Sequence, residues 1–208
     1  MTQSKSSLSA DMLANEKQAI AHLKGGNLAG LTVLVQIWQV KAVHAALLIV
    51  RDQGTAEEVV QEAFMQAYRK IDQFDDRRPF GPWFMRSIIH SAIKIADKQK
   101  RVEALEEPQD GSRIAEWLID PGFAPHEIVE TAEFREAVWQ ALAKLTPNQR
   151  AAVVMRYFLD ESESEMVSHL NRPLTTIKWW LHSARQKLKL NLSTLHETES
   201  ESQEVGRE

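Results

Sequence analysis

The spacing of apolar residues is the feature that most restricts how this chain can fold. No segment alternates apolar and polar residues over a sustained run, so signals for β-strands are almost missing. Apolar residues instead recur at the spacing of one helix face, most clearly as Val60, Phe64, Ala67, Tyr68 and Ile71. We therefore predict an all-α protein.

The composition excludes several classes of chemistry. The chain has 208 residues, of which 43% are hydrophobic and 26% charged, and it has no cysteine. Disulfides, cysteine-ligated zinc, iron–sulfur clusters and thiol catalysis are therefore excluded. The N-terminus is polar and lacks the apolar segment of a secretory signal, and polar residues interrupt the most apolar stretch, residues 31–50. We expect a cytoplasmic protein without membrane insertion, in which this stretch forms a buried helix.

Shifts in composition divide the chain into two helical parts. The segment between them is acidic and contains prolines and glycines, which is typical of a flexible linker. It has one short stretch, around 114–118, that could be helical. We predict helical domains over 11–101 and 131–193, an acidic linker over 102–130, and disordered polar ends over 1–10 and 194–208.

The net charge of -4 hides a segregated pattern of charges. Residues 86–101 carry five basic side chains against one acid, and residues 172–193 carry basic side chains and no acid. The linker and the C-terminal tail are acidic. Two basic segments of this kind are compatible with binding to nucleic acid, despite the negative total.

The second basic segment has the pattern of a helix-turn-helix unit over 162–190. Ser162 and Glu165 have the spacing of a capping box, and Asn171 suits the left-handed position at a helix end. Such a unit places its second helix in the major groove of DNA. The outward side of that helix offers Thr175, Thr176, Lys178, Trp180, His182 and Arg185. The alternative is a solvated basic face on an ordinary helical hairpin.

The first basic segment combines aromatic and basic side chains, as single-stranded DNA binding requires. The aromatic residues of this region are Phe74, Phe80, Trp83 and Phe84. The cations include Arg77, Arg78, Arg86 and Lys94, with His90 on the same basic face. The alternative is that the aromatic rings belong to the core, which we favour for Phe84.

A third surface is the helix face with Glu58, Gln61 and Glu62, which could dock onto a basic partner or could simply be solvated. Catalytic motifs are missing: the sequence has no HExxH, P-loop, GxGxxG or GxSxG pattern. We therefore predict a protein that is not an enzyme and that needs no cofactor or metal.

Three sequence signatures follow one another in a recognisable order. They are AEEVVQEAF at 56–64, FGPWFMRSIIH at 80–90, and LTPNQR at 145–150 followed by TIK at 176–178 and AR at 184–185. They are similar to AEDLVQEvF and F..WL..IA.N in region 2, and to LP..QR and TVKSR…AR in region 4, of the extracytoplasmic-function sigma factors. From about residue 27 to 192, the chain thus resembles this group of the sigma-70-type sigma factors of RNA polymerase.

The resemblance implies an alternative sigma factor with a region 2 bundle and a region 4 helix-turn-helix unit. It implies core RNA polymerase as a partner, through the clamp helices of the largest subunit and the flap, together with promoter DNA and an anti-sigma factor. Glu58, Gln61 and Glu62 match the positions that bind the clamp helices.

The resemblance also implies two sets of DNA-binding residues. The set for the −10 element, which is captured as it melts, is Phe74, Arg77, Arg78, Trp83, Arg86, His90 and Lys94. The set for the −35 element is Thr175, Thr176, Lys178, Trp180, His182 and Arg185. The chain departs from the family pattern with His90 in place of Asn and with Trp179-Trp180 in place of Ser-Arg. Two other interpretations remain open: a stand-alone helix-turn-helix regulator, and a degenerate sigma-like adaptor protein.

Overall fold

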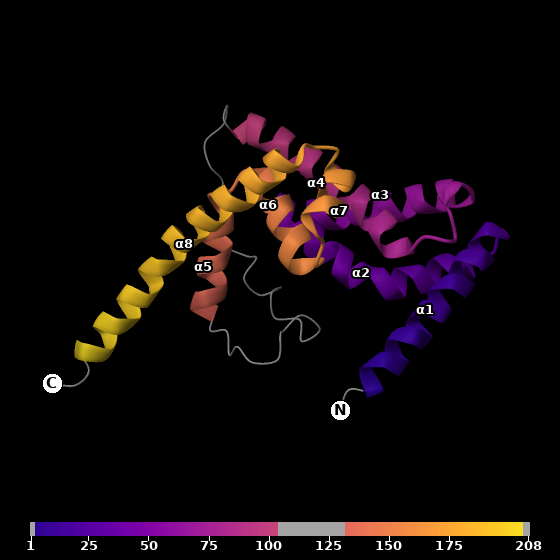
Figure 1. Ribbon diagram of the computed structural model, residues 1–208, viewed down its shortest axis with the longest axis horizontal. Helices are drawn as coiled ribbons and strands as arrows, with labels where there is room; N and C mark the ends of the chain where they lie inside the picture. Colours follow the sequence, from indigo (N-terminus) through magenta and orange to yellow (C-terminus); the bar gives the residue numbers. More distant parts are fainter. Residues whose placement is uncertain (1–2, 104–131, 206–208) are drawn as a thin grey trace. The chain divides into compact units, whose positions relative to one another are not determined.

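A computed structural model describes residues 3–103 and 132–205 of the chain. Those residues form helices joined by short turns, and they contain no strand (Figure 1). The predicted all-α fold is thereby confirmed. Most of the predicted acidic linker, including the short helix expected around 114–118, lies outside the described residues.

The chain divides into two compact units, Met1–Lys94 and Ile95–Glu208. The first contains α1 (Gln3–Lys24), α2 (Ala29–Val50), α3 (Gln53–Lys70), the 3-10 turn η1 (Ile71–Gln73) and most of α4 (Phe80–Glu103). The second contains α5 (Ala132–Ala143), α6 (Pro147–Val153), the π-helical turn η3 (Val154–Phe158), α7 (Glu163–Leu170) and α8 (Leu174–Val205). The boundary therefore falls inside α4, a little before the domain end predicted at 101.

Helix α2 is the centre of the first unit, where α1 and α3 pack against it. By length and composition alone it could span a membrane, but 50% of its most apolar window is buried inside the protein. Leu34, Leu47 and Ile49 are among its fully buried side chains. The buried helix predicted over 31–50 is thus present, and its apolar character is explained by the core.

The turns of the first unit have identifiable causes. Arg51 ends α2 in the left-handed conformation, with φ of 66°, and Asp52 begins α3 by accepting a 2.7 Å hydrogen bond from the backbone N–H of Thr55. Helix α4 begins at Phe80, the first residue of the FGPWFMRSIIH signature. Pro82 causes no break there, because the first turn of a helix needs no N–H donor.

Two capping boxes fix the helix starts of the second unit. Thr146 caps α6 together with Gln149. Ser162 caps α7 together with Glu165, and this second capping box was predicted from sequence. The N–H···O distances from the capped residues to the two hydroxyls are both 3.3 Å. Asn171 ends α7 with φ of 50°, the left-handed conformation expected from sequence.

The two ends of the chain differ from the sequence prediction. Residues 3–10 belong to α1, and residues 194–205 belong to α8, although both segments were expected to be disordered. The sequence from 174 to 205 contains neither glycine nor proline. Once α8 has formed, adding further residues costs little and nothing stops the helix before Gly206.

Candidate nucleic-acid and polymerase interfaces

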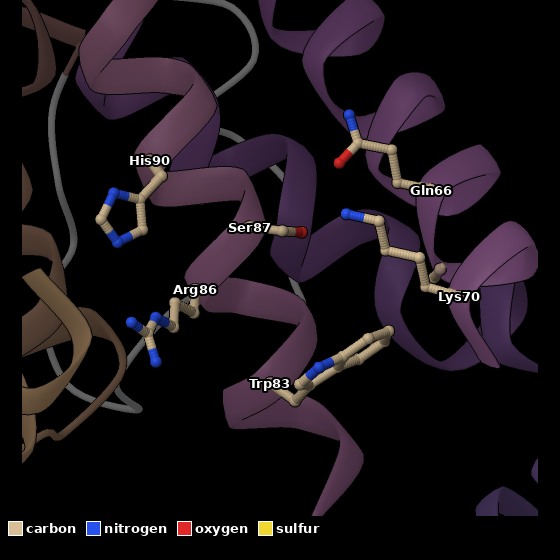
Figure 2. A pocket seen from close by; sticks show the side chains of 7 residues that line it. Gln66, Lys70, Trp83, Arg86, Ser87 and His90 are labelled. Carbon is tan, nitrogen blue, oxygen red and sulfur yellow. The ribbon is translucent and has the colours of Figure 1, made fainter. Parts of the chain in front are cut away.

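A cavity of about 290 Å³ lies between α3 and α4 and gathers several of the predicted −10 residues. Its lining comprises Gln66, Ala67, Lys70, Trp83, Arg86, Ser87 and His90. Figure 2 shows the side chains of Lys70 and Ser87 pointing toward one another, with the Trp83 indole nearby, while Arg86 and His90 project to another side of α4. The cavity thus has an aromatic wall and a cationic rim, a combination that suits a nucleobase with its phosphate.

Trp83 packs against an aromatic cluster in the core of the first unit. The Trp83 ring lies 5.2 Å from the ring of Phe74 and 5.5 Å from that of Phe80, between ring centroids. Trp83 is half-buried, whereas Phe74 is only 4% exposed and Phe80 is fully buried. In this conformation Phe74 therefore offers no free face to a base, and its ring contacts those of Phe80 and Trp83.

The loop before α4 places Arg77 and Arg78 on the surface. The Arg77 guanidinium donates to both carboxylate oxygens of Asp75, at 2.9 and 3.1 Å. These hydrogen bonds, with a further one from the Arg77 backbone N–H, hold the pKa of Asp75 below its ordinary value. Asp75 thereby orders the loop, while most of the Arg77 side chain, 89%, stays accessible.

A second cavity, of about 440 Å³, lies between this loop and α1. Its lining comprises Leu13, Glu16, Lys17, Ile20, Ala21, Asp76, Arg77, Arg78 and Pro79. Lys24 of α1 ties the loop down, because its ammonium lies 2.7 Å from the Asp76 carboxylate and donates to the Phe74 carbonyl at 2.8 Å. Sequence reasoning found the loop arginines but not the contribution of α1.

The predicted polymerase-binding residues form one exposed strip on α3. Glu58, Gln61 and Glu62 are all exposed. Glu62 accepts hydrogen bonds from Gln66 at 3.2 Å and from Arg69 at 3.4 Å, so its carboxylate is oriented along the helix. Met65 continues the strip with 43% of its surface exposed. Acidic groups beside an exposed thioether are suited to a partner surface with both basic and apolar residues.

The first turns of α8 present most of the predicted −35 residues on one side. Thr175, Lys178, His182 and Arg185 are exposed, while Ile177, Leu181 and Ala184 are buried on the opposite side. Thr176 and Trp180 are half-buried at the border. Trp179, which the sequence analysis did not select, is 61% exposed and belongs to the exposed side. Two adjacent tryptophans give no sequence signal for which one points outward.

The LTPNQR signature has a structural function in this chain. Gln149 completes the α6 capping box and donates to the Ser183 hydroxyl at 2.9 Å, so it connects α6 to α8. Arg150 is 8% exposed and donates to the Leu145 carbonyl at 3.0 Å. The hydrogen bond from Gln149 to Ser183 holds α8 against α6 and thereby helps to orient the exposed side of α8.

A mostly buried contact joins the loop between η3 and α7 to a residue near the end of α7. The Glu161 carboxylate lies 2.8 Å from Nδ1 of His169, and both side chains are mostly buried. Burial raises the pKa of Glu161, and the neighbouring His169 opposes part of that shift. Among the described residues, no group of three or more His, Cys, Asp or Glu side chains could hold a metal ion.

Comparison with known proteins agrees with this division of the chain. The model of sigma-70 region 2 matches residues 34–102, and the model of sigma-70 region 4 matches residues 135–188. The extracytoplasmic-function sigma factor SigW of Bacillus subtilis is 28% identical over 182 residues, which cover 86% of this chain and 97% of SigW. The sigma-E factor of Escherichia coli K12 is 27% identical over 141 residues, which cover 65% of this chain and 72% of that protein.

Solved structures have the same fold. CnrH, solved in complex with the cytosolic domain of CnrY, superposes with a TM-score of 0.58 at 20% identity, over 86% of this chain and 98% of that one. The sigma factor RpoE of Bartonella quintana, solved with the anti-sigma factor NepR, superposes with a TM-score of 0.56 at 19% identity, over 76% of this chain and 94% of that one. With regions 2 and 4 matched in order and the curated relatives in agreement, the chain belongs to the extracytoplasmic-function group of the sigma-70 family of RNA polymerase sigma factors.

Proposed function

We propose that this protein is an alternative sigma factor that binds core RNA polymerase and directs it to its promoters. The observation that carries the proposal is the order of the two family regions, each with an exposed surface of suitable chemistry. The protein would act in the cytoplasm and without enzymatic activity of its own, because its task is to bind and position DNA on the polymerase.

The region 2 unit would capture the −10 element as a single strand. In this proposal a base stacks on Trp83 in the cavity between α3 and α4, and Lys70 and Arg86 neutralise adjacent phosphates. A base turned out of the stack would enter the cavity beside Arg77 and Arg78. Stacking on a ring contributes about 1–3 kcal/mol per base, comparable to the cost of unstacking one step of duplex. The −10 duplex can therefore melt because the protein binds its bases once they are unpaired.

The region 4 unit would bind the −35 element with the exposed side of α8 in the major groove. The two units are separate compact bodies, so their spacing on DNA would be set by the polymerase to which both are bound. We also propose an anti-sigma factor as a regulator. Support comes from the two solved relatives, one bound to the cytosolic domain of CnrY and the other to the anti-sigma factor NepR.

The proposal is tested by run-off transcription with purified core polymerase on a library of promoters. We expect transcripts from a defined set of promoters only when the protein is present, and weak promoter binding by the protein alone. Tight and specific duplex binding without polymerase would instead identify a stand-alone regulator. Polymerase binding without initiation at any promoter would identify a sigma-like adaptor.

Trp83 gives the first residue-level prediction. Replacing it by alanine is expected to slow opening of the −10 region about tenfold or more, because the stacking surface is lost. The measurement is permanganate reactivity of unpaired thymines in the polymerase–promoter complex. Trp83→Phe is the matched control, since it retains a ring over Phe74 and Phe80 and should retain most of the opening rate. Equal rates for Trp83→Ala and wild type would contradict the assignment.

Lys178 gives a prediction about electrostatics. Lys178→Ala is expected to weaken holoenzyme binding to −35 promoters and to reduce the slope of log affinity against log salt concentration by about one. Lys144→Ala is the control, because Lys144 is also an exposed lysine of the second unit but lies outside α7 and α8. If both variants change the slope equally, the effect is one of total charge and the assignment to α8 is wrong.

A further inference from the structure

Tyr157 makes a contact on the DNA-binding unit that the family signatures do not explain. Its hydroxyl accepts a hydrogen bond of 2.6 Å from Nε of Arg185, a residue 28 positions later in the chain. The Arg185 guanidinium carbon also lies 5.8 Å from the centre of the tyrosine ring. That separation is near the outer limit for a cation–π contact, so the hydrogen bond is the stronger part of the pair.

The tyrosine is held in place by a rigid support. It lies in the π-helical turn η3, a type of turn that occurs frequently at functional sites. Val154 and Met155 anchor this turn in the core with 2% and 0% exposure. Arg156 donates to the Glu161 carbonyl at 3.0 Å and closes the loop that follows. Tyr157 itself remains 60% exposed.

The hydrogen bond leaves both partners able to bind an anion. Tyr157 is the acceptor, so its own O–H hydrogen remains available to donate. Within the described part of the chain, Arg185 donates through Nε, and its two terminal NH₂ groups remain available as a fork, the geometry that suits a phosphate. Two exposed donors, one of them cationic, thus lie within hydrogen-bonding distance of each other on one side of the unit.

The position of the Tyr157–Arg185 pair on the unit indicates that it contacts a DNA phosphate and not the edge of a base. Arg185 has the same helical phase as Lys178 and His182, at the far end of the exposed side of α8. In helix-turn-helix proteins the first residues of the recognition helix reach base edges, while other donors contact the flanking phosphates. Tyr157 comes from another element and therefore lies beside α8, where a DNA backbone flanks an inserted helix.

We propose that Tyr157 positions Arg185 and that the two side chains together bind one backbone phosphate of the −35 duplex. The inference rests on the proposed sigma function. In this proposal Tyr157 is a DNA-binding and positioning residue. It raises the affinity for DNA and fixes how the unit is aligned on the duplex, but it does not select bases.

The test is a double-mutant cycle of holoenzyme binding to a −35 promoter. Tyr157→Phe keeps the ring and removes only the hydroxyl, and we expect it to weaken binding about tenfold. Arg185→Ala should weaken binding at least as much, and the double variant should be no weaker than Arg185→Ala alone. Tyr68→Phe, at the only other tyrosine of the chain, is the matched control and should bind as wild type.

A second readout separates this role from a structural one. Replacing −35 phosphates one at a time by neutral methylphosphonates should reveal one position at which wild type and Tyr157→Phe bind equally well. Base preference over a −35 library should be unchanged in Tyr157→Phe. Additive losses in the cycle, unchanged or tighter binding by Tyr157→Phe, or an altered base preference would each overturn the inference. If the wild-type protein does not direct transcription from any promoter, the proposed function itself is refuted.

Discussion

Replacing Gln61 and Glu62 together by alanine is expected to lower affinity for core RNA polymerase about 10- to 100-fold, or about 1.4–2.8 kcal/mol. Both side chains are exposed, and neither is part of the packed core of the first unit. Their removal should therefore leave helix content and thermal stability unchanged. The measurement is titration of labelled protein with core polymerase, together with circular dichroism of the free variant.

The chain provides a matched control for this pair. Asp72 and Gln73 are likewise an exposed acid and an exposed glutamine of the first unit, but they lie in η1, beyond the end of α3. Asp72→Ala with Gln73→Ala makes the same chemical change away from the proposed strip and should retain full affinity. Equal losses in the two double variants would mean that polymerase responds to the charge of the unit as a whole, and the strip would lose its assignment.

Met65 extends this reasoning from charge to apolar contact. It is exposed in line with Glu58 and Glu62, so a partner that covers the acids would also cover its thioether. Interfaces commonly draw much of their affinity from a few such apolar side chains surrounded by polar ones. The sequence places Met65 on the same side of the helix as the acids, but the charge pattern gives no reason to assign it to an interface.

Local features of this fold could be predicted from sequence because their causes are local. The capping box at Ser162 and the left-handed Asn171 depend on residues within one turn of each other. The all-α class likewise follows from apolar spacing within single helices. Helix α6 likewise starts at Pro147 for a local reason, because proline suits the first position of a helix.

The cavities could not be predicted, because their walls come from segments that sequence does not pair. Lys70 lines a cavity with Trp83 only because α3 and α4 lie side by side there, and Lys17 lines another with Arg78 only because α1 reaches the loop. Whether an aromatic side chain is buried also depends on tertiary packing, which the sequence does not show. Phe74 was expected at the DNA surface, but it fills space under Trp83 instead.

The largest expected effect on stability comes from Gly30→Ala. Gly30 is buried at the start of α2, where α1 crosses it closely. A Cβ atom there would lie 2.2 Å from the Ala19 carbonyl oxygen and 2.9 Å from the Leu23 backbone nitrogen. Both neighbours are backbone atoms of a helix, so neither can move without shifting α1. We expect about 2–3 kcal/mol of destabilisation, lowering the melting temperature of the first unit by about 10–20 °C.

Gly54→Ala is the control that separates the steric clash at Gly30 from the effect that any glycine-to-alanine change has on helix stability. Gly54 lies in the first turn of α3, and a Cβ there would meet only the Asp52 carboxylate, at an ordinary 3.7 Å. Alanine favours the helix over glycine by about 0.5–1 kcal/mol, so this variant should be as stable as wild type or slightly more stable. The measurement is the melting temperature of both variants by calorimetry.

If Gly30→Ala unfolds at the wild-type temperature, α1 does not pack against α2 as closely as the distances indicate. If both variants lose stability equally, the cause lies in the glycine-to-alanine change itself and not in the crossing of the two helices.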